Sequence, residues 1–219
     1  MKSLLICLVI SSLVLAEELV PLPLVLPRAA FAGTPMVDEE DPAFADVEDV
    51  PTIAQYRAAL PKVPQSTKQL ALNKIVTASS SVYSQSLKLV TDGQKEAYED
   101  TSVELRPRTQ WIQIDLGESK NIYSIVIWHF HLEPVIFHDV IVQVSNDPEF
   151  SSGVITLFNN DKDNSSKLGV GTNSEYWETN LGKIVDGKCS SCRYIRCYSK
   201  GSTYSDPLNR YTEVEIWGE

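Results

Sequence analysis

The chain has 219 residues with 19 Lys and Arg against 29 Asp and Glu, which gives a formal net charge of -10. Its basic residues form no run, and this excludes the usual footprints of a nucleic-acid partner or of binding to an anionic membrane surface. The length allows one well-cored domain and an additional N-terminal region.

Residues 1–16 have the layout of a secretory signal peptide. Lys2 precedes an apolar run, and the small-residue spacing before Glu17 suits cleavage after Ala16. A second cleavage pattern ends at Ala32, so two mature starts are consistent with the sequence. The apolar run is too short for a membrane span. We therefore expect a protein that is secreted, periplasmic or held at the cell surface.

Residues 17–67 are rich in proline and acidic side chains. Eight of the twelve prolines lie between Pro21 and Pro64, and residues 37–51 carry the acidic patch VDEEDPAFADVEDVP. Proline lacks a backbone donor and fixes its own φ, which disfavours a continuous packed element. This pattern predicts a tether with one short helix over residues 52–60.

Residues 68–219 show the pattern of an all-β domain. Short runs of β-branched and aromatic residues are bounded by turn residues, and no amphipathic helical window of similar length competes with them. Strands at this spacing without intervening helices predict an antiparallel β-sandwich or barrel. The expected strands cover residues 111–117, 122–131, 139–145, 153–158, 193–199 and 211–218.

Six segments occur in an order that resembles the factor V/VIII C-type (discoidin) domains, and most closely the family-32 carbohydrate-binding modules. These segments are LALNKIVTASSS, LVTDG, WIQIDLG, VIVQVSNDPEF, RYIRCYS and TEVEIWG. The resemblance implies a galactose-binding-like jelly roll with a glycan or surface-ligand site on its loops. It also implies one structural calcium ion.

The resemblance places the calcium ligands at Asp92 of TDG and Glu213 of TEVEIWG, with backbone carbonyls near Gln94 and Thr212. Calcium accepts such a mixture of carboxylate and carbonyl oxygens. The chain departs from the family in the long stretch 94–108, where a short turn is usual. A turn aspartate and a solvent-facing strand glutamate are the alternative interpretation.

A second oxygen-rich cluster lies in FNNDKDNSS, where Asp161, Asp163 and Asn164 have calcium-loop spacing. The glycine and the terminal glutamate of an EF-hand are missing, and these residue types are also common in ordinary loops. We favour the ordinary loop. Asn164 begins an Asn-Ser-Ser acceptor for N-glycosylation.

The only three histidines are His129, His131 and His138. If Ile125 and the residues on its face point inward, the three imidazoles can meet at one end of the sandwich. If Val126 and its face point inward, they cannot. Three imidazoles could bind zinc or copper. The alternatives are partly buried side chains at a strand end, or contacts to a sugar, whose hydroxyl groups suit a neutral imidazole.

The resemblance also points to sugar contacts from His, Arg and Asn around a stacking ring. Besides His129 and His131, the candidate ligand residues are Arg106, Arg108, Trp177, Tyr204, Asn209 and Arg210.

Cleavage of the signal peptide would leave Cys189, Cys192 and Cys197, an odd number for an exported protein. Cys189 and Cys192 could form a short loop disulfide. Strand alternation places Cys192 and Cys197 on opposite faces and predicts that Cys197 is a buried apolar residue.

No nucleophile elbow, phosphate-binding glycine loop or HExxH motif is present. The sequence therefore predicts a non-catalytic extracytoplasmic module that binds carbohydrate or a similar cell-surface ligand and holds a structural calcium. Two alternatives stay open. One is a structural or protein-adhesion surface domain, and the other is a protein, or a metalloenzyme, that holds a transition metal on its histidines.

Overall fold

The computed structural model describes residues 17–37, 41, 44–204 and 207–219. The predicted signal peptide, residues 1–16, lies outside the described residues. None of the helices in the described part of the chain is long and apolar enough to cross a membrane.

Strands dominate the structure. They are β1 (Leu19–Pro21), β2 (Val47–Glu48), β3 (Lys62–Pro64), β4 (Lys68–Gln69), β5 (Ile75–Ala78), β6 (Val82–Ser84), β7 (Val103–Leu105), β8 (Gln110–His129), β9 (Ile141–Ser145), β10 (Ile155–Asn159), β11 (Glu175–Tyr176), β12 (Lys183–Ser199) and β13 (Asn209–Gly218). In the described part of the chain, the short helix α1 (Ile53–Ala58) and the 3₁₀ helix η2 (Leu87–Thr91) accompany them.

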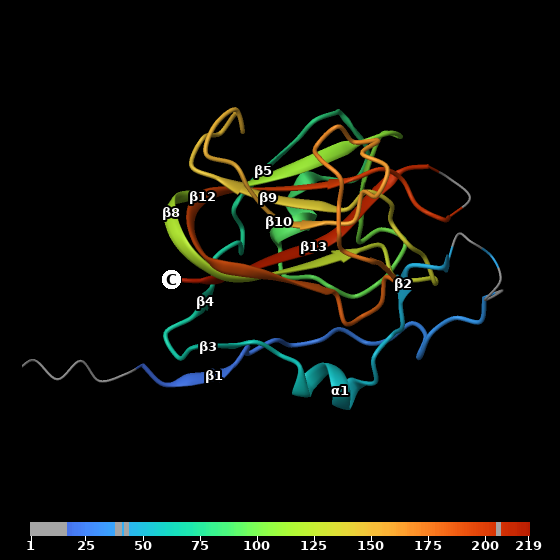
Figure 1. The fold of residues 1–219 in the computed structure, drawn as a ribbon, viewed down its shortest axis with the longest axis horizontal. Helices are drawn as coiled ribbons and strands as arrows, with labels where there is room; N and C mark the ends of the chain where they lie inside the picture. The colour runs from blue at the N-terminus through green and yellow to red at the C-terminus, as the bar shows by residue number, and fades with distance from the viewer. Residues whose placement is uncertain (1–16, 38–40, 42–43, 205–206) are drawn as a thin grey trace, which may run out of the picture.

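The two layers of the sandwich are joined by the long strands β8 and β12, which bend sharply (Figure 1). Residues 110–115 of β8 pair with β5 and with the C-terminal half of β12, which continues to β9 and β10. Residues 122–129 of β8 pair instead with the N-terminal half of β12 and with β13, which continues to β7. Both layers are antiparallel, so the predicted all-β antiparallel sandwich is confirmed.

One extended core fills the space between the layers. It takes Ile112 and Ile114 from the first half of β8 and Ile125 and Ile127 from the second half, and all four are fully buried. Burial of such side chains contributes roughly 1.5–3 kcal/mol each. Because the strand bends, residues from its two halves face each other, whereas the sequence pattern predicted two separate strands over 111–117 and 122–131.

The short helix expected over residues 52–60 is present as α1. Thr52 caps its N-terminus, and the Gln55 side chain in turn accepts a hydrogen bond from the Thr52 backbone amide. This reciprocal pair satisfies two backbone donors that the first helical turn leaves free. On the inner side of α1, the Tyr56 hydroxyl donates to the backbone carbonyl of Leu181 at 2.6 Å. The helix is therefore attached to the sandwich.

The N-terminal segment, residues 17–67, was expected to be a tether, but its described parts lie along one side of the sandwich (Figure 1). Strands β1 and β3 pair with each other, and β2 pairs with β11. Leu22 and Val63 are 2% exposed and form a second apolar cluster with Val126 and Trp128 of β8. Prolines interrupt regular pairing here, but they do not prevent side-chain burial.

This packing settles which face of β8 points inward. Ile125 and Ile127 belong to the main core, whereas Val126 and Trp128 lie under the N-terminal segment. Both faces of the strand are buried, which is why the sequence showed no clear alternation of polar and apolar residues there. His129 follows on the face of Ile127 and therefore points into the core.

Candidate functional site

Several loops gather at the end of the sandwich opposite the bend in β8 (Figure 1). The loop 130–140 pairs with the loop 200–208 through an isolated bridge between Phe137 and Ser202 and through the hydrogen bond from the His138 amide to the Gly201 carbonyl. On the other side, the Asn160 amide donates to the Val140 carbonyl. Loops on a rigid sandwich are the usual place for binding residues.

One cavity at this end combines aromatic rings with an arginine. Its volume is about 310 Å³. The Arg210 guanidinium carbon lies 5.2 Å from the ring centroids of both Phe130 and Tyr204. Its Nε donates to Glu104 at 3.0 Å. Glu133 also lines the cavity. Flat rings beside fixed charged donors and acceptors suit a ligand with both apolar C–H faces and hydroxyl groups.

The other predicted sugar-contacting residues lie elsewhere. Asn209 is fully buried, and its amide donates to the backbone carbonyls of Arg106 and Arg108. Asn209 therefore supports the loop before β8, while the two arginine side chains are exposed. Trp177 is 9% exposed and stacks on Phe44 with ring centroids 5.7 Å apart. Of the predicted set, Tyr204 and Arg210 line the same cavity.

His129 and His131 are fully buried. The His129 ring pairs with Glu178 through Nδ1 at 2.6 Å and stacks on Phe137. The His131 Nε2 contacts the Lys95 carbonyl at 2.9 Å, and burial lowers the pKa of His131. Neither imidazole reaches a surface that a glycan could touch, which contradicts the predicted sugar contacts of His129 and His131.

His138 lies apart from the other two histidines. It is partly exposed, and its Nδ1 contacts Glu175 at 2.8 Å. This carboxylate raises the pKa of His138. Among the described residues, the three imidazoles form no group whose ligand atoms lie within 4.8 Å of one another. The arrangement therefore gives no support to a shared zinc or copper site.

The residues predicted to bind calcium do lie together. Glu213 is fully buried, and its Oε2 accepts from the Gly93 amide at 3.2 Å. Its Oε1 has no hydrogen-bond partner in the described structure. Burial, with the added repulsion of Asp92 and Glu215, raises the pKa of Glu213 to about 9. A buried carboxylate oxygen without a donor beside a second carboxylate fits a cation, which would satisfy that oxygen and favour the ionised form.

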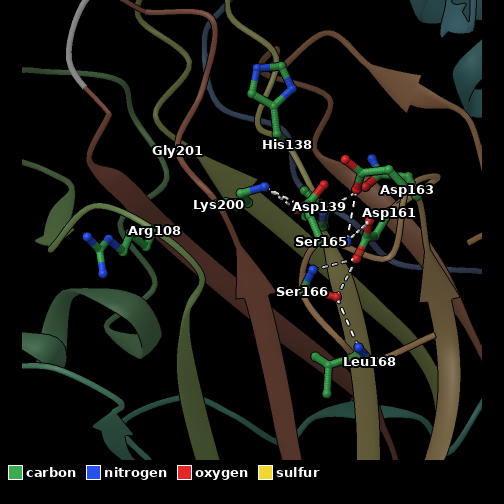
Figure 2. Close-up of polar contacts among 12 residues, drawn as sticks. Arg108, His138, Asp139, Asp161, Asp163, Ser165, Ser166, Leu168, Lys200 and Gly201 are labelled. Atoms are coloured by element: carbon green, nitrogen blue, oxygen red, sulfur yellow. Dashed lines mark hydrogen bonds and ion pairs between the residues drawn. The ribbon is translucent and has the colours of Figure 1, made fainter. Parts of the chain in front are cut away.

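A second carboxylate group occupies the loop end, and Figure 2 shows it beside Lys200. One carboxylate oxygen from each of Asp139, Asp161 and Asp163 lies within 4.8 Å of the others. The backbone amide of Ser165 donates to Asp161 and Asp163, and hydrogen bonds from Ser165 lower the pKa of Asp163. Sequence reasoning favoured an ordinary loop here, but the fold adds a third aspartate, so the cluster is one that could hold a metal ion.

The predicted disulfide is not formed: Cys189 and Cys192 are free. Cys189 is exposed at a positive φ of 52°, whereas Cys192 is buried in the main core. A register shift in β12 after Cys192 places its side chain in the same core as Cys197, so the prediction of opposite faces was wrong. The burial of Cys197 is confirmed, at 1% exposure.

Sequence reasoning did not assign Phe130, Glu104, Asp139 or Asn160 to a ligand or metal site. Phe130 reads as one more apolar residue of a strand, and Asp139 as a turn residue before β9. No local signal links Asp139 to a cluster 22 residues later, since only the pairing of the loops brings them together.

Comparison with known proteins agrees with this fold. Residues 89–179 match the F5/F8 type C family model described as "NedA-like, galactose-binding domain". The predicted resemblance to factor V/VIII C-type domains is therefore confirmed over that range. No curated protein sequence matches the chain.

Three solved structures share the fold with TM-scores of 0.50 to 0.52. A family-32 module produced by Clostridium perfringens, in complex with GlcNAc-α-1,4-galactose, is 13% identical (TM-score 0.52) over 71% of this chain and 97% of its own. Truncated AlyQ, with family-32 module and alginate lyase domains, is 20% identical with a TM-score of 0.50. The match covers 70% of this chain and 34% of the AlyQ chain. A family 89 glycoside hydrolase from C. perfringens is 16% identical with a TM-score of 0.52. The match covers 69% of this chain and 14% of the hydrolase. The chain thus spans a minor part of the last two, and this similarity establishes the fold alone.

Proposed function

We propose that this protein is a non-catalytic, extracytoplasmic module that binds glycans in the cavity formed by Phe130, Tyr204, Arg210 and Glu104. The observation that carries the proposal is the position of the Arg210 guanidinium, 5.2 Å from two ring centroids and hydrogen-bonded to Glu104. The pair supplies fixed donors and acceptors for sugar hydroxyls, and the rings supply an apolar face. The glycan complex of the C. perfringens module with the same fold supports a carbohydrate as the ligand class.

The same cavity carries two more carboxylates at its rim, Glu99 and Glu133, besides Glu104. Because these three glutamates line the cavity together with one arginine, Arg210, the lining carries a net negative charge. Repulsion of like charges would disfavour uronic-acid or sulfated glycans there. We therefore propose a neutral glycan as the ligand, and a cavity of about 310 Å³ suits one or two sugar rings.

A glycan array, probed with the chain from residue 17, tests this proposal. We expect binding to neutral glycans, and about a 3- to 10-fold loss of affinity in Tyr204→Ala, because a ring contact contributes about 0.5–1.5 kcal/mol. Arg210→Lys should weaken binding about tenfold or more, because the lysine ammonium cannot reproduce the fixed, planar set of hydrogen-bond donors of the guanidinium.

Two matched variants control for general damage. Tyr83→Ala removes an exposed tyrosine from β6, and Arg193→Ala removes an arginine that pairs with Asp115 on the outer face of the sandwich. Both should bind glycans like the parent protein. If no glycan binds, or if the control variants lose as much affinity as the cavity variants, the proposed site is wrong.

We further propose that Asp92 and Glu213 hold a structural calcium ion, with backbone carbonyls near Gln94 and Thr212. The support is the partnerless Oε1 of the buried Glu213. Calcium would link the loop after η2 to the last strand, β13. The ion would neutralise the buried carboxylate of Glu213. It would not contact the sugar, which would bind in the separate glycan cavity.

Chelation should therefore lower the melting temperature. At a free calcium concentration 100-fold above Kd, binding stabilises the fold by about 2.7 kcal/mol, which corresponds to a shift of about 5–10 °C. Scanning calorimetry with calcium and with chelator measures the shift. Asp92→Asn should melt lower and respond less to chelator, whereas Asp100→Asn, at another exposed aspartate, should behave like the parent. An unchanged melting temperature on chelation would exclude the structural ion.

A further inference from the structure

The loop end holds a second cavity, whose lining shares no residue with that of the proposed glycan site. Its volume is about 450 Å³. The N-terminal segment contributes Ala45 and Asp46 to its wall, and the sandwich contributes His138, Asp139, Asn160, Lys162, Asp163, Ser165, Glu175 and Lys200. Asp161 is fully buried, and one of its carboxylate oxygens lies within 4.8 Å of carboxylate oxygens of Asp139 and Asp163.

The charges around this cavity do not balance. Lys162 pairs with Asp46 at 2.9 Å, and His138 contacts Glu175 at 2.8 Å, so two of the acidic residues have their own basic partners. The three clustered aspartates share a single nearby ammonium, Lys200, which lies 3.5 Å from Asp139 (Figure 2). Three carboxylates against one ammonium leave an excess of two negative charges.

An unpartnered amide points independently to an occupant. Asn160 is 2% exposed, and its Nδ2 has no hydrogen-bond partner among the described residues. Its Oδ1 accepts from the Val140 amide at 2.6 Å, which fixes the orientation of the side chain and leaves the NH₂ group as the unsatisfied end. A buried donor without an acceptor costs about 1–3 kcal/mol. An oxygen atom held in the cavity would remove this cost.

We propose that Asp139, Asp161 and Asp163 form a second divalent-cation site, that the ion is calcium, and that it holds a water or ligand hydroxyl oxygen to which Asn160 donates. A divalent cation matches the excess charge of the cluster. Carboxylate oxygens within 4.8 Å of one another can share one ion, since calcium–oxygen distances are about 2.3–2.6 Å. Calcium tolerates an irregular set of loop oxygens, whereas magnesium requires near-ideal octahedral geometry.

Lys200 gives the proposal a distinctive consequence. Its ammonium donates to the Ser165 hydroxyl at 2.6 Å, and that hydroxyl donates to Asp139 at 2.5 Å. The lysine therefore partly neutralises the cluster when no ion is bound and competes with a bound cation. Removing this ammonium should strengthen cation binding, whereas a purely structural role of the cluster predicts no such gain.

Calorimetric titration with CaCl₂ tests the site in the chain from residue 17. The Asp92→Asn background removes a ligand of the first proposed calcium site, so the two proposals can fail independently. In this background we expect one bound calcium, at least tenfold weaker binding in Asp163→Asn, and about 3- to 10-fold tighter binding in Lys200→Met.

The matched control is Asp147→Asn. Asp147 is held by Ser151 and Ser152 in the same way that Asp161 is held by Ser165 and Ser166, but it belongs to no carboxylate group among the described residues. Its loss should leave calcium binding unchanged. The site would be disproved by absence of calcium binding in the Asp92→Asn background, by an Asp147→Asn effect equal to that of Asp163→Asn, or by unchanged affinity in Lys200→Met.

Discussion

Residues 68–219 expressed alone should unfold at a much lower temperature than the chain from residue 17. The N-terminal segment buries Leu22 and Val63 against Val126 and Trp128. Loss of two such buried side chains removes about 3–6 kcal/mol, before the apolar surface newly exposed on β8 is considered. For a domain of this size that corresponds to a decrease of about 10–20 °C.

Scanning calorimetry of the two chains measures this difference directly. Leu22→Asn in the longer chain is a useful intermediate, because it disturbs the apolar contact while the rest of the segment stays in place. We expect it to reproduce part of the loss. Equal melting temperatures for residues 68–219 and the longer chain would instead support the sequence prediction of an independent tether.

The same segment contributes to the proposed calcium cavity at the loop end. Asp46 accepts from the Ser174 hydroxyl at 3.0 Å and pairs with Lys162 at 2.9 Å. Removal of residues 17–67 would release Lys162 and open one wall of the cavity. The segment therefore connects stability to the geometry of the loop end, which a simple spacer would not do.

Trp128→Ala should be the most destabilising single substitution, at about 3–5 kcal/mol. The ring is fully buried, its Nε1 donates to the Asn180 carbonyl at 3.0 Å, and the Lys95 ammonium lies 5.0 Å from the ring centroid. Gly182 packs directly on the ring: a Cβ at this positive-φ residue would lie 2.6 Å from Cε2. Alanine would leave a cavity and an unpaired carbonyl.

Chemical denaturation of Trp128→Ala measures the loss, and Trp111→Ala is its control. Trp111 is only partly buried, and its ring stacks with Arg196, so its removal should cost much less. In residues 68–219 expressed alone, Trp128 lacks its contacts with the N-terminal segment. Trp128→Ala should therefore lower the free energy of unfolding less there than in the longer chain. Equal costs in the two chains would show that the N-terminal segment does not stabilise the protein through Trp128.

The strands β8, β9, β10, β12 and β13 could be predicted, at least in part, because their local pattern is independent of their partners. Alternation in WIQIDLG and TEVEIWG predicted half-buried strands, and the structure contains both segments as strands within β8 and β13. WIQIDLG is half-buried as predicted, whereas every residue of TEVEIWG except Trp217 is buried. The continuity of β8 could not be predicted, because the polar residues 118–121 separated the two predicted strands, whereas they lie within β8 between its two halves. A polar stretch at a bend and one at a loop look alike in sequence.

The candidate sites were predictable only in part. Asp92 and Glu213 were found through the family resemblance, and Tyr204 and Arg210 through their residue types in a loop. His129 has the same residue type as a sugar-binding histidine, but its face of β8 points to the core, where it pairs with Glu178. Residue type alone does not give the direction of a side chain on a strand that is buried on both faces.

The sequence by itself determined the all-β class, the resemblance to discoidin-type domains and the acidic character of the chain, because these depend on composition, alternation and the order of segments. Only the tertiary structure decided that the N-terminal segment covers Trp128, that Arg210 lies near both Phe130 and Tyr204, and that Asp139 joins Asp161 and Asp163. Each of these contacts joins residues distant in the chain, and their proximity follows from strand register and loop packing, which no local pattern encodes.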